Sequence, residues 1–298
     1  MESEHSVSIL VVRKTTNLEW YGTYVKEQVA RGNLPPGDLD VLVHANREHY
    51  EALDRLRRAL DQRAVVWAEA QRENDWPLGL QYDVVITVGG DGTLLAASHN
   101  LGEDTVIAGV KSSGTSVGHL CVAGIAGIDG LVESIVGGTY RTMRAARLMA
   151  DVTHVARHGG AGQITTVPIL NDFLYTNTNP AATTRYRLHV GDESEEQKSS
   201  GIWIATATGS TAAIMAAGGS IRPRSDRDFQ YAVREVFRVG DRQPRLVRGM
   251  FDPDTGSIEI ENRCESALLA LDGQHGEVQL GLGDRIRFRR GPDLRMIV

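Results

Sequence analysis

Three glycines, one aspartate and one threonine form the segment Gly89-Gly-Asp-Gly-Thr93, directly after an apolar run at residues 82–88. The run predicts a buried strand. Glycines let backbone N–H groups approach a phosphate closely, and a helix predicted over residues 94–100 would direct its positive dipole end at the same anion. Asp91 disfavours simple phosphate binding, but its carboxylate could accept a proton from a hydroxyl that attacks a phosphoryl group. The segment therefore predicts phosphoryl transfer, and a simple tight turn is the alternative.

A second segment, Thr206-Ala-Thr-Gly-Ser-Thr-Ala212, is rich in small and hydroxyl side chains and precedes a short helix predicted over residues 212–217. Its hydroxyl groups could form a compact polar surface for the phosphates and ribose of a nucleotide. Asn171-Asp172, after the apolar run 167–170, could add hydrogen bonds to a ribose or an amide. Each feature alone also fits a helix N-cap or a turn, whereas their combination favours a nucleotide site.

Other short motifs predict different chemistry. Gly114-Thr-Ser-Val-Gly118 matches the nucleophile elbow of serine hydrolases, with Ser116 as the nucleophile and His275 as a later histidine. That elbow requires a helix immediately after the serine. Residues 109–116 begin with the spacing of a P-loop but lack its lysine. The histidines lack metal-binding spacing, so we expect them to be solvated or in the core.

The composition is that of a soluble globular protein. The chain has 298 residues, 41% of them hydrophobic and 23% charged, which is enough for one large domain or two ordinary ones. A net charge of −6 argues against a nucleic-acid-binding protein. The cysteines, Cys121 and Cys264, form no CxxC pattern, no basic signal-peptide region precedes the first apolar run, and no apolar run approaches the ~20 residues of a membrane span. We therefore expect a cytoplasmic protein that contacts neither membrane nor nucleic acid.

An α/β domain and a β domain are expected to position the Gly89–Thr93 and Thr206–Ala212 segments. Strands are predicted over residues 7–12, 41–43, 64–67, 84–88 and 105–110, and helices over residues 18–30, 48–60 and 128–136, with Thr16 or Asn17 as the first N-cap. Such alternation predicts a mainly parallel sheet covered by helices. After Gly137-Gly138 the period becomes two, as at Tyr186, Leu188 and Val190. We therefore predict an α/β domain over residues 1–137 that carries the Gly89–Thr93 segment. Residues 138–298 would form a mostly antiparallel, sandwich-like β domain with one helix after Ser210.

Four motifs in this order resemble those of the NAD kinase family: Gly89-Gly-Asp-Gly-Thr93, Asn171-Asp172, the Thr206–Ala212 segment and Leu271-Asp-Gly-Gln274. The resemblance covers nearly the whole chain. It is strongest to the plant NADH kinase and mitochondrial branch, to which four segments are similar: Arg13-Lys-Thr-Thr16, Gly118-His-Leu-Cys121, Lys198-Ser-Ser-Gly201 and Asp228-Phe-Gln-Tyr-Ala-Val-Arg-Glu235. The chain departs from the mainstream bacterial pattern at several positions, among them Lys111 near the usual asparagine, Ser200 for an aspartate and Ala213 for a tyrosine.

The resemblance implies a two-domain NAD kinase-like enzyme that uses ATP, with Mg²⁺ or another divalent cation, to phosphorylate the adenosine ribose 2′-hydroxyl of NAD or NADH. It implies that Asp91 is the general base and that the ATP phosphates are bound by Gly89, Gly90, Gly92 and Thr93. The NAD(H)-binding residues would be Asn171, Asp172, Ser200, Gly201, Thr206, Thr208, Gly209, Ser210, Thr211 and Ala212. No protein ligand for the metal is assigned, and a homodimer or larger homo-oligomer is expected.

Two other functions remain open at this point. One is a non-catalytic NAD(H)-binding sensor of the same fold, and the other is a kinase of another small hydroxyl substrate, such as a nucleoside or a lipid.

Overall fold

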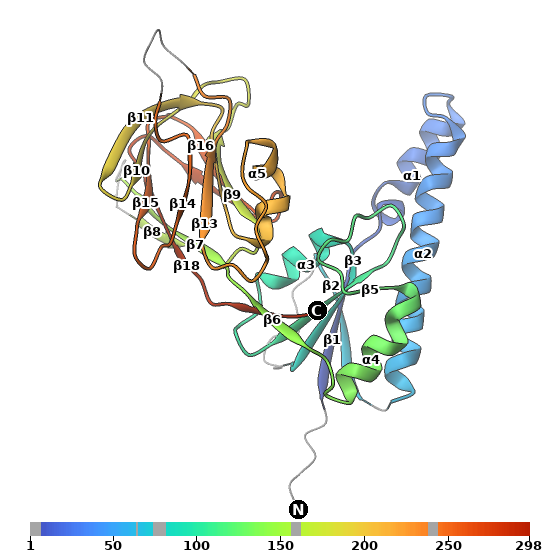
Figure 1. Ribbon diagram of the computed structural model, residues 1–298. Coiled ribbons are helices and arrows are strands. Elements are labelled where there is room, and N and C mark those ends of the chain that lie inside the picture. The colour runs from blue at the N-terminus through green and yellow to red at the C-terminus, as the bar shows by residue number, and fades with distance from the viewer. Residues whose placement is uncertain (1–6, 64, 74–81, 156–161, 238–243) are drawn as a thin grey trace, which may run out of the picture. The chain divides into compact units, whose positions relative to one another are not determined.

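The computed structural model describes residues 7–63, 65–73, 82–155, 162–237 and 244–298, and the chain forms two compact units (Figure 1). The first unit contains the residues up to Ala97, then Leu101–Met143 and Arg295–Val298; the second contains Ser98–Asn100 and Arg144–Leu294. The division expected after residue 137 differs from these units at three places, the first of which is Ser98–Asn100, because these residues belong to the second unit. The first unit continues to Met143, and it regains the last residues because a C-terminal strand pairs with a strand of the first sheet.

The first unit is built on a seven-stranded sheet with the order β2-β1-β3-β4-β19-β6, and β5 pairs with β4. The pairs β1–β2, β1–β3, β3–β4, β4–β5 and β4–β19 are all parallel, which confirms the predicted mainly parallel sheet. The predicted strand start at Ala64 lies outside the described residues. The strands are β1 (Ser8–Arg13), β2 (Val66–Gln71), β3 (Val84–Gly89), β4 (Val106–Lys111), β5 (Ala123–Gly124), β6 (Thr142–Ala145) and β19 (Leu294–Ile297).

Helices cover this sheet. Leu53 and Leu56 of α2 pack with Ile86 and with Val132 of α4 in one buried cluster. Leu94 of α3 approaches the sheet from the opposite face, where a Cβ at Gly109 would lie 2.9 Å from Leu94 Cδ1. The helices are α1 (Asn17–Ala30), α2 (Pro36–Asp61), α3 (Asp91–Ser98) and α4 (Ile128–Val136), the last preceded by the 3₁₀ turn η1 (Ile125–Gly127).

The ends of the first two helices follow local rules. Thr16 caps α1 as predicted: its hydroxyl accepts the backbone N–H of Glu19, and the Glu19 carboxylate accepts the backbone N–H of Thr16 at 2.6 Å. The strand predicted at residues 41–43 is wrong, because these residues lie within α2. Pro36 begins that helix, where its missing N–H costs nothing.

The second unit contains two six-stranded sheets, with the orders β11-β10-β15-β18-β7-β8 and β14-β13-β12-β9-β16-β17. Neighbouring strands in both are antiparallel, and one shared cluster that includes Phe173, Tyr175, Tyr186 and Phe288 fills the core. The predicted antiparallel, sandwich-like architecture is confirmed. The strands are β7 (Leu148–His154), β8 (Gly162–Thr165), β9 (Asp172–Asn177), β10 (Thr184–Val190), β11 (Glu193–Ser199), β12 (Ile202–Ala205), β13 (Phe229–Val233), β14 (Arg248–Phe251), β15 (Ile258–Asn262), β16 (Ala267–Leu271), β17 (Glu277–Leu280) and β18 (Arg285–Arg290).

The helix predicted after Ser210 is short. A 3₁₀ turn, η2 (Thr208–Thr211), leads into α5 (Ala213–Ala216), and both lie between β12 and β13 in the chain.

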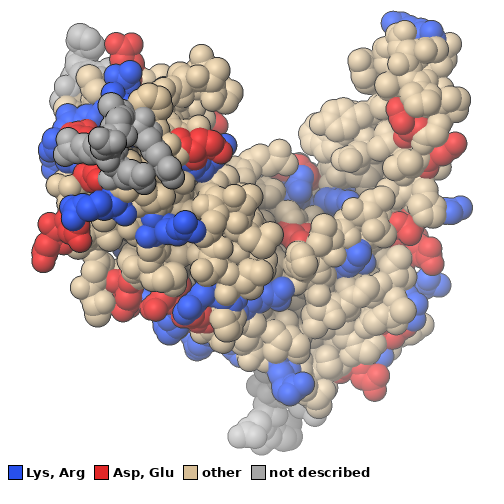
Figure 2. All heavy atoms as spheres, turned by 45° about the horizontal axis from the view of Figure 1, so that its top comes forward, with Lys and Arg blue, Asp and Glu red and all other residues tan. Residues whose placement is uncertain are grey.

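Within the described residues, no helix combines the length and the apolar character that crossing a membrane requires. Basic and acidic side chains are interspersed over the face drawn in Figure 2.

Candidate functional site

The Gly89–Thr93 segment lies at the carboxyl end of β3, where open parallel sheets bind ligands. The following helix begins at Asp91, earlier than the predicted residue 94, so the aspartate lies in its first turn. The turn is tight: a Cβ at Gly89 would overlap the side chain of Thr93, and a Cβ at Gly90 would lie 3.0 Å from the Ser116 hydroxyl. Only glycine lets the backbone pass here, which keeps its N–H groups accessible to an anion.

The Asp91 carboxylate is held by backbone N–H groups. Its Oδ1 accepts the N–H of Leu120 at 2.7 Å, and its Oδ2 accepts the N–H of His119 at 3.1 Å. Each carboxylate oxygen has a second lone pair, so Asp91 can still accept a proton or a hydroxyl hydrogen bond. The sequence did not predict this contact, although it singled out Gly118-His-Leu-Cys121 as a resemblance.

The serine hydrolase alternative fails on geometry. A nucleophile elbow places its serine between a strand and an immediate helix. Within the described chain, turns, bends and the short strand β5 follow Ser116 before the 3₁₀ turn that begins at Ile125. Ser116 instead lies beside Gly90. The serine therefore belongs to the wall of the Gly89–Thr93 turn.

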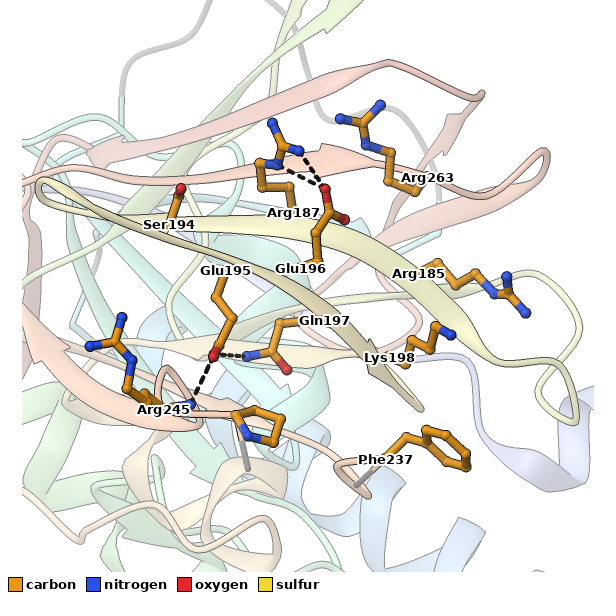
Figure 3. Close-up of a pocket in the computed structure, with 11 residues that line it drawn as sticks. Arg185, Arg187, Ser194, Glu195, Glu196, Gln197, Lys198, Phe237, Arg245 and Arg263 are labelled. Carbon is orange, nitrogen blue, oxygen red and sulfur yellow. Dashed lines mark hydrogen bonds and ion pairs between the residues drawn. The ribbon is translucent and has the colours of Figure 1, made fainter. Parts of the chain in front are cut away.

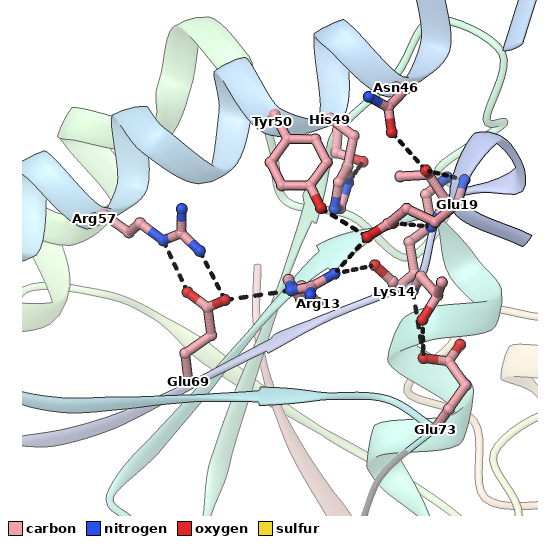
Figure 4. Close-up of polar contacts among 12 residues, drawn as sticks. Arg13, Lys14, Glu19, Asn46, His49, Tyr50, Arg57, Glu69 and Glu73 are labelled. Atoms are coloured by element: carbon pink, nitrogen blue, oxygen red, sulfur yellow. Dashed lines mark hydrogen bonds and ion pairs between the residues drawn. The ribbon is translucent and has the colours of Figure 1, made fainter. Parts of the chain in front are cut away.

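Polar contacts connect the carboxyl ends of β1 and β2 with the adjoining helices (Figure 4). Arg13 approaches Glu19 at 3.5 Å and Glu69 at 3.3 Å, and Arg57 pairs with Glu69 at 2.8 Å. Burial and the neighbouring Arg72 guanidinium lower the pKa of Lys14. The Arg13-Lys-Thr-Thr16 segment thus anchors the edge of the sheet next to β3.

His49 of α2 is a core histidine, as expected. Its side chain, labelled in Figure 4, is buried, and its Nδ1 lies 2.9 Å from the Ser112 hydroxyl. Burial, reinforced by the charge of Lys14, lowers the pKa of His49 to about 4. The imidazole is therefore neutral at neutral pH. The Ser112 N–H in turn donates to the Gly89 carbonyl at 2.9 Å. His49 therefore supports Ser112, the residue that holds Gly89 at the start of the turn.

In the second unit, Asp272 organises the predicted Asn171-Asp172 pair. Its carboxylate accepts the backbone N–H groups of Leu170 at 3.0 Å, Asn171 at 2.7 Å and Asp172 at 3.1 Å. His99 Nε2 lies 2.8 Å from the same carboxylate. Asp272 was absent from the predicted site, although the Leu271-Asp-Gly-Gln274 motif pointed to it. It acts as a scaffold that fixes the backbone from Leu170 to Asp172.

The Thr206–Ala212 segment packs directly on Asn171. The Thr206 N–H donates to the Asn171 carbonyl at 2.9 Å, and a Cβ at Gly209 would overlap that carbonyl group. The hydroxyls of Thr206 and Ser210, predicted to contact a ligand, are used inside the protein. Thr206 donates to the Leu170 carbonyl and accepts the Gly209 N–H, and Ser210 bonds to the backbone of Arg222.

Two polar atoms in this cluster have no hydrogen-bond partner among the described residues. They are Asn171 Oδ1 and Thr208 Oγ1, and both are buried. Buried polar atoms are normally satisfied, so each orphan requires an explanation, and a bound polar ligand would supply one. Thr211 is exposed, and the Ala212 N–H bonds to the Gly209 carbonyl at 2.8 Å.

The predicted Ser200-Gly201 pair has a structural role of its own. Gly201 has φ +116°, and a Cβ there would overlap the Tyr175 carbonyl oxygen. Only glycine fits this position. The Ser200 carbonyl accepts the Thr176 hydroxyl at 3.1 Å, which fixes the connection between β11 and β12.

Asp172 is a buried carboxyl group, only 4% exposed. Burial, followed by the charge of Asp272, raises its pKa to about 7. The unfolded chain releases this proton near pH 4, so folding takes up a proton between about pH 4 and pH 7. The contribution of Asp172 to the free energy of unfolding therefore falls as the pH rises through that window and is constant above it.

We expect Asp172→Asn to increase the free energy of unfolding more at pH 8 than at pH 5, because asparagine carries no charge that burial could penalise. Urea denaturation of both proteins at the two pH values measures the difference. Asp192→Asn, in the exposed turn between β10 and β11, is the matched control. An equal effect of Asp172→Asn at both pH values would contradict the raised pKa.

A pocket of about 950 Å³ lies along the β10–β11 hairpin (Figure 3). Its lining includes Arg185, Arg187 and Lys198, and Arg187 pairs with Glu196 at 2.6 Å. Among the described residues that line it, none belongs to the predicted site. This pocket lacks the glycine turn and the scaffolded carboxylates, so we place the candidate chemistry elsewhere.

The described residues contain no group of three or more His, Cys, Asp or Glu side chains that could hold a metal ion.

No family model matches the chain. A probable NADH kinase of Oryza sativa subsp. japonica is 29% identical over 287 residues, which cover 88% of this chain and 85% of that protein. An NAD kinase of Methanopyrus kandleri is 32% identical over 215 residues, 69% of this chain and 72% of that protein. The crystal structure of yeast NADH kinase complexed with NADH has the same fold, with a TM-score of 0.69, 16% identity, and coverage of 99% of this chain and 84% of that one.

Proposed function

The chain belongs to the NAD kinase family, and from this premise we propose that it transfers the γ-phosphoryl group of ATP to the adenosine ribose 2′-hydroxyl of NAD or NADH. The products are ADP and NADP or NADPH. The protein is thus an enzyme, a phosphotransferase with an alcohol group as acceptor. The observation that carries the proposal is the placement of Asp91, a carboxylate at the carboxyl end of β3 inside the glycine turn.

The residues of the first unit would hold the phosphates and the base. Backbone N–H groups of Gly89, Gly90 and Gly92, at the N-terminus of α3, would donate to the phosphate oxygens of ATP. Thr93 would contribute by closing the turn, since its own N–H donates to the Gly90 carbonyl at 3.0 Å. Asp91 would accept the proton of the attacking hydroxyl while the new O–P bond forms. The bond from the γ-phosphorus to its bridging oxygen breaks, and ADP leaves with that electron pair.

The residues of the second unit would bind the dinucleotide. Asn171 and Thr208 offer the unpartnered Oδ1 and Oγ1 atoms, and Asp172 offers a carboxyl group for a ribose hydroxyl. Thr206, Gly209 and Ser210 would act through the backbone they fix. The remaining predicted contacts are Ser200, Gly201, Thr211 and Ala212. Positioning of this kind supplies much of the rate in phosphoryl transfer.

Mg²⁺ or another divalent cation would enter with ATP, bound by its phosphate oxygens, and would spread the charge that builds up on the transferred group. The described residues offer no multidentate cluster for a resident ion, so no step is assigned to one. We also propose a homodimer or larger homo-oligomer, which the family resemblance supports. A cytoplasmic location is supported by the free thiols of Cys121 and Cys264.

A substrate panel tests the proposal. The protein is incubated with ATP and Mg²⁺ and, in parallel, with NAD, NADH, a nucleoside or a lipid alcohol, and ADP release is measured in each. We expect release with NAD or NADH only. Release with the nucleoside or lipid alone would indicate another hydroxyl substrate, whereas tight NADH binding without ADP release would indicate a sensor.

A further inference from the structure

Lys111 is the last residue of β4, at the edge of the sheet that carries the glycine turn. It lies opposite Gly89 of β3 and Gly124 of β5 in the sheet register. The neighbouring Val110 packs into the α2 side of the sheet, and because side chains alternate along a strand, Lys111 points to the opposite side. Asp91 begins the helix that covers this side. The lysine therefore starts on the same face as the proposed base.

The Lys111 stem is held by the loop that binds Asp91. Gly118 has φ +71°, and a Cβ there would lie 2.9 Å from Lys111 Cδ and 3.2 Å from Cγ. Only glycine both adopts this conformation readily and leaves room for the lysine stem. The next residues, His119 and Leu120, donate their N–H groups to Asp91. One loop thus fixes the direction of the lysine and the position of the carboxylate.

The charges of Lys111 and Asp91 act on the same sulfur atom. Burial, followed by the Asp91 carboxylate, raises the pKa of the Cys121 thiol to about 11, and the Lys111 ammonium opposes this shift. Both charged groups must therefore lie within electrostatic reach of Cys121. This proximity agrees with the hydrogen bonds of the His119 and Leu120 N–H groups to Asp91 and with the packing of the Lys111 stem on Gly118.

Lys111 has no acidic partner in the part of the chain that the structure describes, since no carboxylate oxygen lies within 4.0 Å of its ammonium group. Asp91 is bonded to backbone N–H groups instead. The side chain is only partly exposed. A partly exposed lysine whose stem packs on the loop that binds Asp91, and which has no acidic partner among the described residues, is suited to an anionic ligand.

We propose that Lys111 donates hydrogen bonds to the γ-phosphoryl oxygens of ATP and neutralises the charge on them during transfer. This deepens the proposed function and rests on it. Asp91 takes the hydroxyl proton and ADP leaves with the electron pair of the broken P–O bond, while Lys111 keeps its protons throughout. The lysine would thus stabilise the phosphoryl group during transfer, while Asp91 deprotonates the hydroxyl that attacks this group.

Lys111→Met tests the assignment, because methionine retains most of the stem that packs on Gly118 but carries no charge. We expect kcat to fall by about 10²-fold, as when one transition-state donor is removed, with the Kd of NADH unchanged. Lys111→Arg should recover part of kcat. Lys26→Met, at an exposed position of α1, is the control and should match the wild type in every measurement. Turnover of Lys111→Met within about 3-fold of the wild type would overturn the proposal.

A binding measurement separates this proposal from the proposed function. Calorimetry gives the Kd of ADP and of a non-hydrolysable ATP analogue with Mg²⁺ for each variant. Lys111→Met should weaken the analogue by roughly 10-fold or more and leave ADP unchanged, because only the analogue carries a γ-phosphate. Equal weakening of both ligands would indicate a general structural role and contradict the assignment. If the wild type formed no NADP(H), the proposed function would fail while this comparison still decided the role of Lys111.

Discussion

Asp91→Asn is expected to lower kcat by at least ~10²-fold, because an amide cannot take the proton of the attacking hydroxyl. The substitution keeps the shape of the side chain. Its Oδ1 can still accept one N–H from the His119-Leu120 loop, while its NH₂ group faces the other. We therefore expect a loss of about 1–3 kcal/mol in the free energy of unfolding, and NADH binding should change little.

Steady-state rates and urea denaturation of the same preparations check both parts of this expectation. Asp129→Asn is the matched control, because it removes another carboxylate of the first unit, one that pairs with Arg55 at 2.5 Å at the surface. The control should lose little stability and no turnover. Full turnover in Asp91→Asn would remove Asp91 from the role of base.

Gly209→Ala is expected to distort the proposed dinucleotide-binding surface of the second unit. A Cβ at this position would overlap the carbonyl group of Asn171, and the overlapping atoms belong to the backbone, so no flexible side chain can move away. The Thr206–Ala212 segment must then shift from Asn171. Overpacking of this kind costs about 1–3 kcal/mol, and we expect the Kd of NADH to rise by at least ~10-fold.

Fluorescence titration with NADH and thermal denaturation measure the two effects. Gly162→Ala in the same unit is the control, since its Cβ would meet no atom closer than His154 Cδ2 at 3.9 Å. Unchanged NADH affinity in Gly209→Ala would show that the Thr206–Ala212 segment does not form the dinucleotide site.

The sequence predicted those features that local chemistry determines. The glycine turn after β3, the Thr16 cap and the period-two strands of the second unit all follow from neighbouring residues. The strand predicted at residues 41–43 failed because valine favours strands only as an average. Val41 and Val43 are 57% and 48% exposed on α2, and the 3.6-residue period through Leu53 and Leu56 decides the structure.

Long-range hydrogen bonds could not be read from the sequence. Residue type identified Thr206 and Ser210 as hydroxyl groups, but not that their partners would be the backbones of Leu170 and Arg222. Asp272 contacts residues about a hundred positions earlier in the chain. Such pairs depend on which strands become neighbours, and this is a property of the whole fold.

The most direct test of the account is the structure of the reaction product. The protein is incubated with NAD or NADH, Mg²⁺ and ATP labelled in its γ-phosphate, and the dinucleotide is analysed by mass spectrometry and ³¹P NMR. We predict that the labelled phosphate appears on the 2′-oxygen of the adenosine ribose, with one ADP formed per phosphate transferred. An unlabelled dinucleotide under conditions in which NADH binds, or a label on any other oxygen, would contradict the account.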